Sequence, residues 1–277
     1  MAALKVQSRR PQKRKIGRPR EETDVLEARG SNRPGRRRKL AERLAWRARA
    51  KARPKKAGSI YDLRAAMRSL PGYDPRRAAD RYVFRPLRAH AAIRWMQDNL
   101  THVEGQWAQG PDPIHFERWQ QGIIANLFGW YERKTGLRRY RKAFIFVPRK
   151  NGKTLLAASI VNLMGFQDKE PGAGLYSAAA DREQARLIFT AASRQILQND
   201  KLTDGARIYH NSIIYDGGRA TYKALSAEAG TKHGINGYLI IVDELHAQPD
   251  RRLVDTLLTS IGARRQPLVL LITTSDW

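Results

Sequence analysis

Residues 148–154 have the composition of a phosphate-binding turn, because they read Pro-Arg-Lys-Asn-Gly-Lys-Thr between an apolar run and an amphipathic stretch. A turn in this position can direct backbone N–H groups, and the positive end of the helix that follows, at phosphate oxygens. We expect the Lys153 ammonium to reach the β- and γ-phosphates of a nucleotide and the Thr154 hydroxyl to take a Mg²⁺ ligand position. The full P-loop pattern has Gly where this chain has Val147, so only its second half is present. The expected nucleotide contacts in the turn are Lys150, Asn151, Gly152, Lys153 and Thr154.

An acidic pair, Asp243 and Glu244, closes the apolar run at residues 239–242. A nucleotide hydrolase needs such a pair at the C-terminal end of a strand that neighbours the phosphate-binding turn. Asp243 would hold Mg²⁺ through water, and Glu244 would orient and deprotonate the attacking water as a general base. The alternative is a buried strand that simply meets its loop.

Small hydroxyl residues end a further apolar run, at Thr273, Thr274 and Ser275. Hydroxyl groups at such a strand end can sense a γ-phosphate and pass its presence to moving parts. A plain strand-to-turn transition explains the same residues equally well.

An aromatic residue and an amide, Trp119 and Gln120, precede the phosphate-binding turn. A Gln amide can pair with a donor and an acceptor on adenine while an aromatic ring covers the base. We therefore consider both residues for a nucleotide-base contact. The alternative is that Trp119 belongs to the core.

The elements that would position these residues indicate an α/β fold. Short apolar runs alternate with amphipathic stretches, which favours a mostly parallel sheet flanked by helices. Strands are expected at residues 142–147, 174–178, 238–242 and 267–273, helices at 153–164, 181–197 and 250–261, and a hairpin at 208–224 around Asp216-Gly217-Gly218. Asp181 is expected to cap the second helix with Gln184 as its capping-box partner.

Charge and composition divide the chain into three parts. Residues 1–60 contain 21 Lys and Arg against 5 Asp and Glu, which gives +16 of the total net charge of +26. We expect a basic, largely disordered tail at 1–59, a helical appendage at 60–115 and a core at 116–277. The tail would attract a polyanion such as nucleic acid.

Absent residue types exclude several kinds of chemistry. The chain has no Cys, so disulfides, thiolate metal sites and cysteine nucleophiles are excluded. The sequence has neither an apolar run of bilayer length nor the apolar core of a signal peptide, so we expect a soluble, intracellular protein that does not contact membranes.

The order of these motifs resembles the ATPase domain of phage terminase large subunits, in the group typified by HK97-like phages. The resemblance covers about residues 79–277 and rests on Phe-x-x-Trp-Gln, Pro-Arg-Lys-Asn-Gly-Lys-Thr, Tyr-Ser-Ala-Ala-Ala-Asp-Arg-Glu-Gln-Ala, Asp-Glu-Leu-His and Thr-Thr-Ser. By position it assigns Trp119 and Gln120 to adenine, and Thr273 and Thr274 to coupling. It assigns Arg149, Lys153 and Thr154 to the phosphate loop, where Arg149 would serve catalysis in cis.

The resemblance implies a P-loop ATPase core of the additional-strand (ASCE) type, with the strand of Glu244 next to the phosphate loop. It also implies ATP and Mg²⁺ as cofactors and a ring of subunits that moves double-stranded DNA into a procapsid. The ring would work on a portal protein, with a small subunit, in the bacterial host cytoplasm. Relatives place an arginine just ahead of the acidic strand, where this chain has Lys232 and His233. They also continue into a nuclease domain whose activity is not expected in this chain, which we read as truncated at its C-terminus.

Two other functions fit the same motifs. One is a different nucleic-acid-dependent P-loop ATPase, such as a helicase. The other is a non-hydrolysing fragment that binds DNA or assists assembly through its basic tail. The basic segment at residues 133–142 would contact DNA phosphates in either case, although a solvated surface explains it as well.

Overall fold

The computed structural model describes residues 60–70, 80–105, 112–179, 182–226, 235–248, 251–262 and 264–274. The expected basic tail, the helix cap at Asp181, the cations Lys232 and His233, and Ser275 lie outside the described residues.

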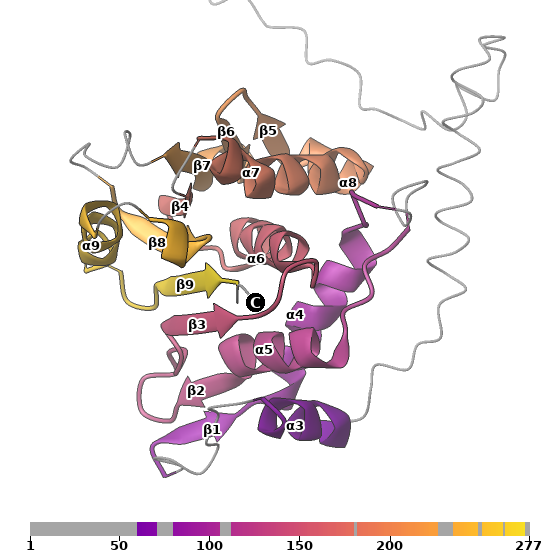
Figure 1. The fold of residues 1–277 in the computed structure, drawn as a ribbon. Coiled ribbons are helices and arrows are strands. Elements are labelled where there is room, and N and C mark those ends of the chain that lie inside the picture. Colours follow the sequence, from indigo (N-terminus) through magenta and orange to yellow (C-terminus); the bar gives the residue numbers. More distant parts are fainter. Residues whose placement is uncertain are drawn as a thin grey trace, which may run out of the picture. The chain divides into compact units, whose positions relative to one another are not determined.

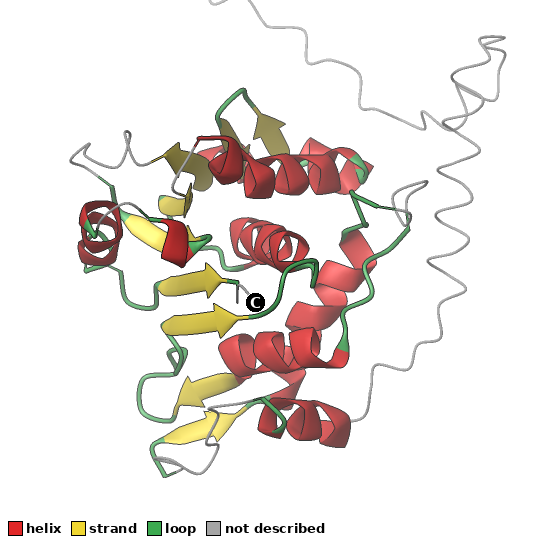
Figure 2. Cartoon of the chain, viewed as in Figure 1, coloured by secondary structure: helices red, strands yellow, loops and turns green. Residues whose placement is uncertain are grey.

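A seven-stranded mixed sheet forms the centre of the described fold (Figures 1 and 2), in the order β3-β9-β8-β4-β7-β6-β5. The strands are β3 (Lys142–Phe146), β4 (Ala173–Ala179), β5 (Ala206–Ile208), β6 (Ser212–Tyr215), β7 (Ala220–Ser226), β8 (Gly237–Val242) and β9 (Leu268–Thr273). The pairs from β3 to β7 are parallel, and β7·β6 and β6·β5 are antiparallel. The expected α/β class, the four strands and the hairpin are confirmed.

Helices cover both faces of the sheet, which explains the unbroken apolar sequence of β8. Leu239 and Ile241 join the core cluster of α6 (Lys153–Gln167) and α7 (Arg182–Leu197). The alternate residues Ile240 and Val242 pack with α9 (Arg252–Thr259) on the other face. No helix of the described segments is long and apolar enough to cross a membrane.

Helix α6 directly follows the phosphate-binding turn and is buried around its whole circumference. Every residue from 156 to 166 is buried. Polar side chains on this helix are therefore paired: Asn162 donates to the carbonyl oxygen of Ala192 on α7 and accepts from the Tyr215 hydroxyl on β6, at 3.1 and 3.0 Å. The start of α6, and with it Lys153, is consequently held by the core of the molecule.

The appendage at residues 60–115, expected to be helical, contains a strand. Helices α3 (Ile60–Arg68) and α4 (Pro86–Asn99) are present, but β1 (Tyr82–Phe84) pairs antiparallel with β2 (Trp130–Glu132). The helical assignment of residues 82–84 was wrong because Pro86 opens α4 and disfavours helix in the residue before it. The sequence Tyr-Val-Phe then follows its strand preference. Helices α3 and α4 pack on α5 (Arg118–Gly129), the helix that carries Trp119 and Gln120.

The strand of the acidic pair does not adjoin the strand of the phosphate-binding turn. Strand β9 lies between β3 and β8 and pairs with both. The expected direct neighbourhood of the two strands was therefore wrong. The inserted strand brings its own C-terminal residues, Thr273 and Thr274, between the turn and the acids.

Three short helical segments complete the elements of the described residues. Helix α8 (Asp200–Asp204) precedes β5, and the turn η4 (Leu245–Ala247) follows the acidic pair directly. The turn η2 (Asp216–Gly218) closes the hairpin between β6 and β7.

Candidate active site

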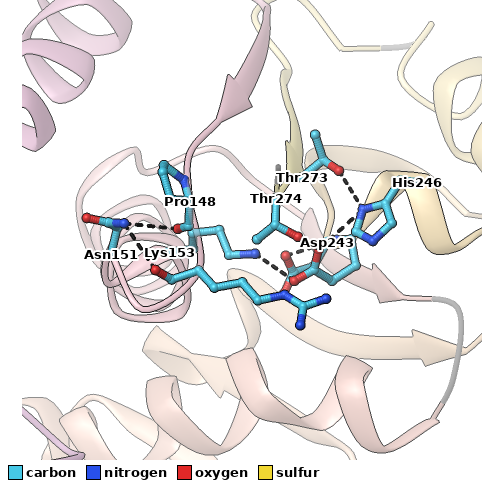
Figure 3. A network of polar contacts seen from close by, with 9 residues as sticks. Pro148, Asn151, Lys153, Asp243, His246, Thr273 and Thr274 are labelled. Atoms are coloured by element: carbon cyan, nitrogen blue, oxygen red, sulfur yellow. Dashed lines mark hydrogen bonds and ion pairs between the residues drawn. The ribbon is translucent and has the colours of Figure 1, made fainter. Parts of the chain in front are cut away.

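The phosphate-binding turn is shaped by its own side chain and by two left-handed residues. The Asn151 side-chain amide donates to the carbonyl oxygens of Pro148 and Arg149, both at 3.1 Å (Figure 3). Lys150 and Gly152 have φ values of 65° and 70°. No side chain caps α6 at Gly152, so the first N–H groups of the helix point out of the helix without a side-chain acceptor. Such groups are suitable donors for phosphate oxygens.

An ion pair joins the turn to the acidic pair. The Lys153 ammonium lies 2.6 Å from Oε1 of Glu244, and the two side chains are 10% and 21% exposed. Thr274 at the end of β9 donates its hydroxyl to the other carboxylate oxygen, Oε2, at 2.9 Å. Three residues assigned by sequence to phosphate binding, water activation and coupling are thus in direct contact.

Glu244 is ionised in this setting. Its partial burial tends to raise the pKa of the carboxyl, but the hydrogen bonds from Lys153 and Thr274 and the charge of Lys153 outweigh that effect and lower the pKa below its usual value. An ionised carboxylate can orient a water molecule and accept its proton.

Asp243 is a buried carboxylate, 6% exposed, at the end of β8. Its backbone N–H donates to Ala178 at the end of β4, and its Oδ1 accepts from the Glu244 backbone N–H at 3.0 Å. Burial raises its pKa, an effect that the charge of Lys153 partly offsets. A divalent cation would favour the ionised form of such a group, so the residue fits a Mg²⁺ ligand.

A metal site at this position would need oxygen ligands from outside the carboxylates. In the part of the chain that the structure describes, no group of three or more His, Asp or Glu is arranged to hold a metal ion. Mg²⁺ commonly takes one or two carboxylates together with phosphate oxygens and water. Asp243, the half-buried Thr154 and a bound triphosphate match that ligand set.

His246 belongs to this network, although its motif Asp-Glu-Leu-His alone indicates no role for it. Its Nδ1 lies 2.7 Å from the Thr273 hydroxyl and 3.5 Å from Oε2 of Glu244 (Figure 3). The turn η4 brings His246 back towards the sheet directly after the acidic pair. In the sequence, His246 is marked only by its place in Asp-Glu-Leu-His. Its contact with Thr273 becomes apparent only when the position of β9 in the sheet is known.

Gln120 lies against the phosphate-binding turn. Its side-chain oxygen accepts from the Glu117 backbone N–H at 3.0 Å, and its amide nitrogen donates to the Asn151 carbonyl oxygen at 3.4 Å. The first bond is part of a capping box at the start of α5. Gln120 is buried, while Trp119 beside it is half-buried. These bonds use one of the two amide hydrogens of Gln120, and the side-chain oxygen, which the expected adenine pairing would also use, already accepts from Glu117.

The basic segment at residues 133–142 divides into exposed and buried cations. Arg133, Lys134, Arg141 and Lys142 are exposed, but Arg138 is buried and paired with Asp168. A DNA contact by this segment cannot include the Arg138 guanidinium, because that group is taken up inside the fold.

The mostly parallel sheet, the phosphate-binding turn after β3, the acidic pair after β8 and the inserted strand β9 define the core of a P-loop ATPase. The chain belongs to the family of terminase large-subunit ATPase domains. Residues 118–277, more than half of the chain, match the model of the family described as "Terminase large subunit, ATPase domain".

Individual relatives are phage terminases. The chain is 35% identical over 138 residues to the terminase large subunit of Enterobacteria phage HK97, across 48% of this chain and 27% of that protein. It is 24% identical over 180 residues to that of Lactococcus phage p2, across 61% of this chain and 32% of that protein. The crystal structure of the HK97 large terminase superposes with a TM-score of 0.57 at 27% identity, over 67% of this chain and 37% of that one. The chain thus spans about a third or less of the curated relatives.

Proposed function

We propose that this chain hydrolyses ATP as the motor domain of a terminase large subunit and couples hydrolysis to the movement of double-stranded DNA into a procapsid. The observation that carries the proposal is the contact of Lys153 and Thr274 with the two oxygens of Glu244. This contact joins the group that would hold phosphate, the group that would activate water and the strand end that would transmit the result.

Catalysis would be mainly electrostatic. Lys153 and the N–H groups at the start of α6 would stabilise charge on the γ-phosphoryl group, with Arg149 as a further cation in cis. Asp243 and Thr154 would hold Mg²⁺, which neutralises charge on phosphate oxygens when bound. Trp119 and Gln120 would contact the adenine, and Lys150, Asn151 and Gly152 the phosphates.

Glu244 and a triphosphate compete for the same ammonium group. The Lys153 ammonium contacts Oε1 of Glu244 at 2.6 Å, and a phosphate oxygen would replace that carboxylate oxygen as its partner. Oε1 would then be available to accept a proton from water, while Thr274 continues to hold Oε2. Nucleotide binding would therefore change the contacts of the carboxylate and, through Thr274, of β9.

The wider assembly follows from the family. The proposal includes a portal protein, a terminase small subunit and a homo-oligomeric ring in the bacterial host cytoplasm, with a cation supplied by a neighbouring subunit. It also includes the three-part division into a basic tail at 1–59, an appendage at 60–115 and the ATPase core at 116–277.

Steady-state hydrolysis and nucleotide binding by the full chain test the enzymatic part. We expect Glu244→Gln to lower kcat by about 10²- to 10⁴-fold while ATP still binds, because a general base is removed and the phosphate site is kept. Lys153→Ala should weaken both binding and turnover. Glu183→Gln removes an exposed carboxylate on α7 and serves as the matched control. A chain that binds ATP but shows no turnover with DNA present would instead support the non-hydrolysing fragment.

A further inference from the structure

The turn that follows the catalytic acid is joined to the central sheet by a polar contact of His246, in addition to the packing of Leu245 against the apolar cluster that includes Ile240 and Val242. Within the turn, the Ala247 N–H donates to the Glu244 carbonyl oxygen at 2.8 Å and the Gln248 N–H to that of Leu245 at 3.3 Å. These bonds hold the turn to itself. The contact of His246 Nδ1 with the Thr273 hydroxyl, at 2.7 Å, connects it to β9.

Glu244 needs such support because its backbone is left-handed. Its φ is 47°, a conformation that residues with a side chain rarely adopt. Strained backbone of this kind persists only where its surroundings determine it. On the N-terminal side, Asp243 is held by β4 and by its own side chain, which accepts from the Glu244 N–H. On the C-terminal side, support comes through the polar contact of His246 with Thr273 and through the packing of Leu245.

We propose that His246 is a positioning residue for hydrolysis, and that its Nδ1 sets the orientation of the Glu244 carboxylate by fastening η4 to Thr273. This inference rests on the proposed function and adds a residue to it. His246 touches neither phosphate nor water in this scheme. It acts through the backbone of residues 244–247 and through the proximity of its Nδ1 to Oε2 of Glu244.

The Thr273 hydroxyl can make the contact with either tautomer of the His246 ring. Thr273 is only 5% exposed, so its hydroxyl needs a partner inside the protein. A hydroxyl both donates and accepts, so it pairs with Nδ1 whether or not that nitrogen carries a proton. Thr274, at the same strand end, donates to Glu244. Both contacts therefore fix the position of the carboxylate relative to β9.

The position of Nδ1 on the ring provides a discriminating test. An Asn amide places a polar atom where Nδ1 lies, whereas the longer Gln amide places it near Nε2. In steady-state ATPase assays of the full chain, we expect His246→Ala and His246→Gln to lower kcat by about 10- to 100-fold. The KM for ATP should stay close to that of the unchanged chain. His246→Asn should recover most of the loss, and the exposed His115→Ala should have no effect.

A double-mutant cycle tests the partner. If Nδ1 acts through the Thr273 hydroxyl, His246→Ala combined with Thr273→Val should be no slower than the slower single variant. Thr273→Ser, which keeps the hydroxyl, should retain more turnover than Thr273→Val.

The outcomes separate this inference from the proposed function. A wild-type chain without ATP turnover would overturn both. A wild-type chain that turns over ATP, with His246→Ala at the same kcat, would overturn the positioning role alone. So would equal losses in the Asn and Gln variants, or a rise in KM that accounts for the loss, because each would show that Nδ1 does not align the carboxylate.

Discussion

Asp243 combines a functional requirement with a stability cost in one side chain. The carboxyl is buried at the end of β8, and burial raises its pKa. The ionised form that would serve a metal ion is therefore unfavourable in the folded chain compared with the unfolded one. Residues of this kind are expected at active sites rather than in structural cores.

Asp243→Asn should raise the melting temperature at neutral pH while abolishing Mg²⁺-dependent hydrolysis. The amide keeps an oxygen acceptor for the Glu244 N–H and removes the buried charge. Because the folded pKa of Asp243 lies above its unfolded value, the destabilisation that this carboxyl causes is full above the folded pKa and is lost as the pH falls. The advantage of Asn should therefore shrink towards about pH 4 and below, where the carboxyl is protonated in both states.

Thermal unfolding at several pH values measures this effect. Asp255→Asn changes an exposed carboxyl on α9 and provides the comparison. A lower melting temperature for Asp243→Asn at neutral pH would mean that the carboxylate stabilises the fold, which is the opposite of what its raised pKa implies.

The sequence offers Lys153, Asp243 and Glu244 as candidates because each belongs to a local pattern, a turn or an acidic strand end. It did not reveal the partners of these groups. The contacts of Thr274 with Glu244 and of His246 with Thr273 join residues 30 and 27 positions apart, and they depend on where β9 lies in the sheet. Residue spacing along the chain carries no information on that order.

At the scale of elements, the phosphate-binding turn is supported by α5. Gly152 has φ of 70°, and a Cβ at this position would lie 3.1 Å from the Gln120 amide nitrogen. The turn therefore needs glycine for its backbone conformation and for the close approach of the Gln120 side chain.

Gly152→Ala should weaken ATP binding by about tenfold, because a side chain in the left-handed region costs roughly 1–2 kcal/mol and the new methyl group displaces Gln120. Titration of the full chain with ATP measures the Kd. Gly217→Ala is a matched control: Gly217 has φ of 67° in the turn η2, with no other atom within 4 Å of the added Cβ. It should cost stability without changing the Kd. Equal affinities for the Gly152 variant and the unchanged chain would contradict this account of the turn.

The secondary structure expected from the sequence differs from the observed one where pairing with a neighbouring segment outweighs the local sequence pattern. The strands at residues 142–147, 174–178, 238–242 and 267–273 agree with β3, β4, β8 and β9 to within two residues at either end. Their apolar composition is a direct result of burial on both faces. Tyr82 and Phe84, by contrast, lie in the appendage that we expected to be helical. They form β1 because Trp130 and Glu132 offer a partner strand that spacing could not foresee.

For the whole molecule, Arg138 shows why a run of basic residues cannot be read as a surface. The guanidinium is buried, with an ion pair to Asp168 just after α6 and a hydrogen bond of 3.1 Å to the Tyr238 hydroxyl on β8. It also donates to the Gln266 carbonyl oxygen ahead of β9, at 2.6 Å. One side chain therefore joins four segments that lie far apart in the sequence.

The position of Arg138 separates structural from catalytic effects. It precedes β3, and its partners lie at the start of β8 and ahead of β9. The phosphate-binding turn and the acidic pair follow the opposite, C-terminal ends of β3 and β8. A change at Arg138 should therefore act on ATP hydrolysis only through the folded fraction of the chain.

Arg138→Met should lower the free energy of unfolding by about 1–3 kcal/mol, since it leaves the half-buried Asp168 without its cation and the Tyr238 hydroxyl without its donor. Against a typical total of about 5–15 kcal/mol, this loss should shift the urea midpoint clearly downward. Arg141→Met removes an exposed cation from the same segment and should leave the midpoint nearly unchanged. Below its own unfolding transition, Arg138→Met should retain the KM for ATP. An unchanged midpoint would show that the four segments hold together without Arg138, and a raised KM below the transition would show that its influence extends to the phosphate-binding turn.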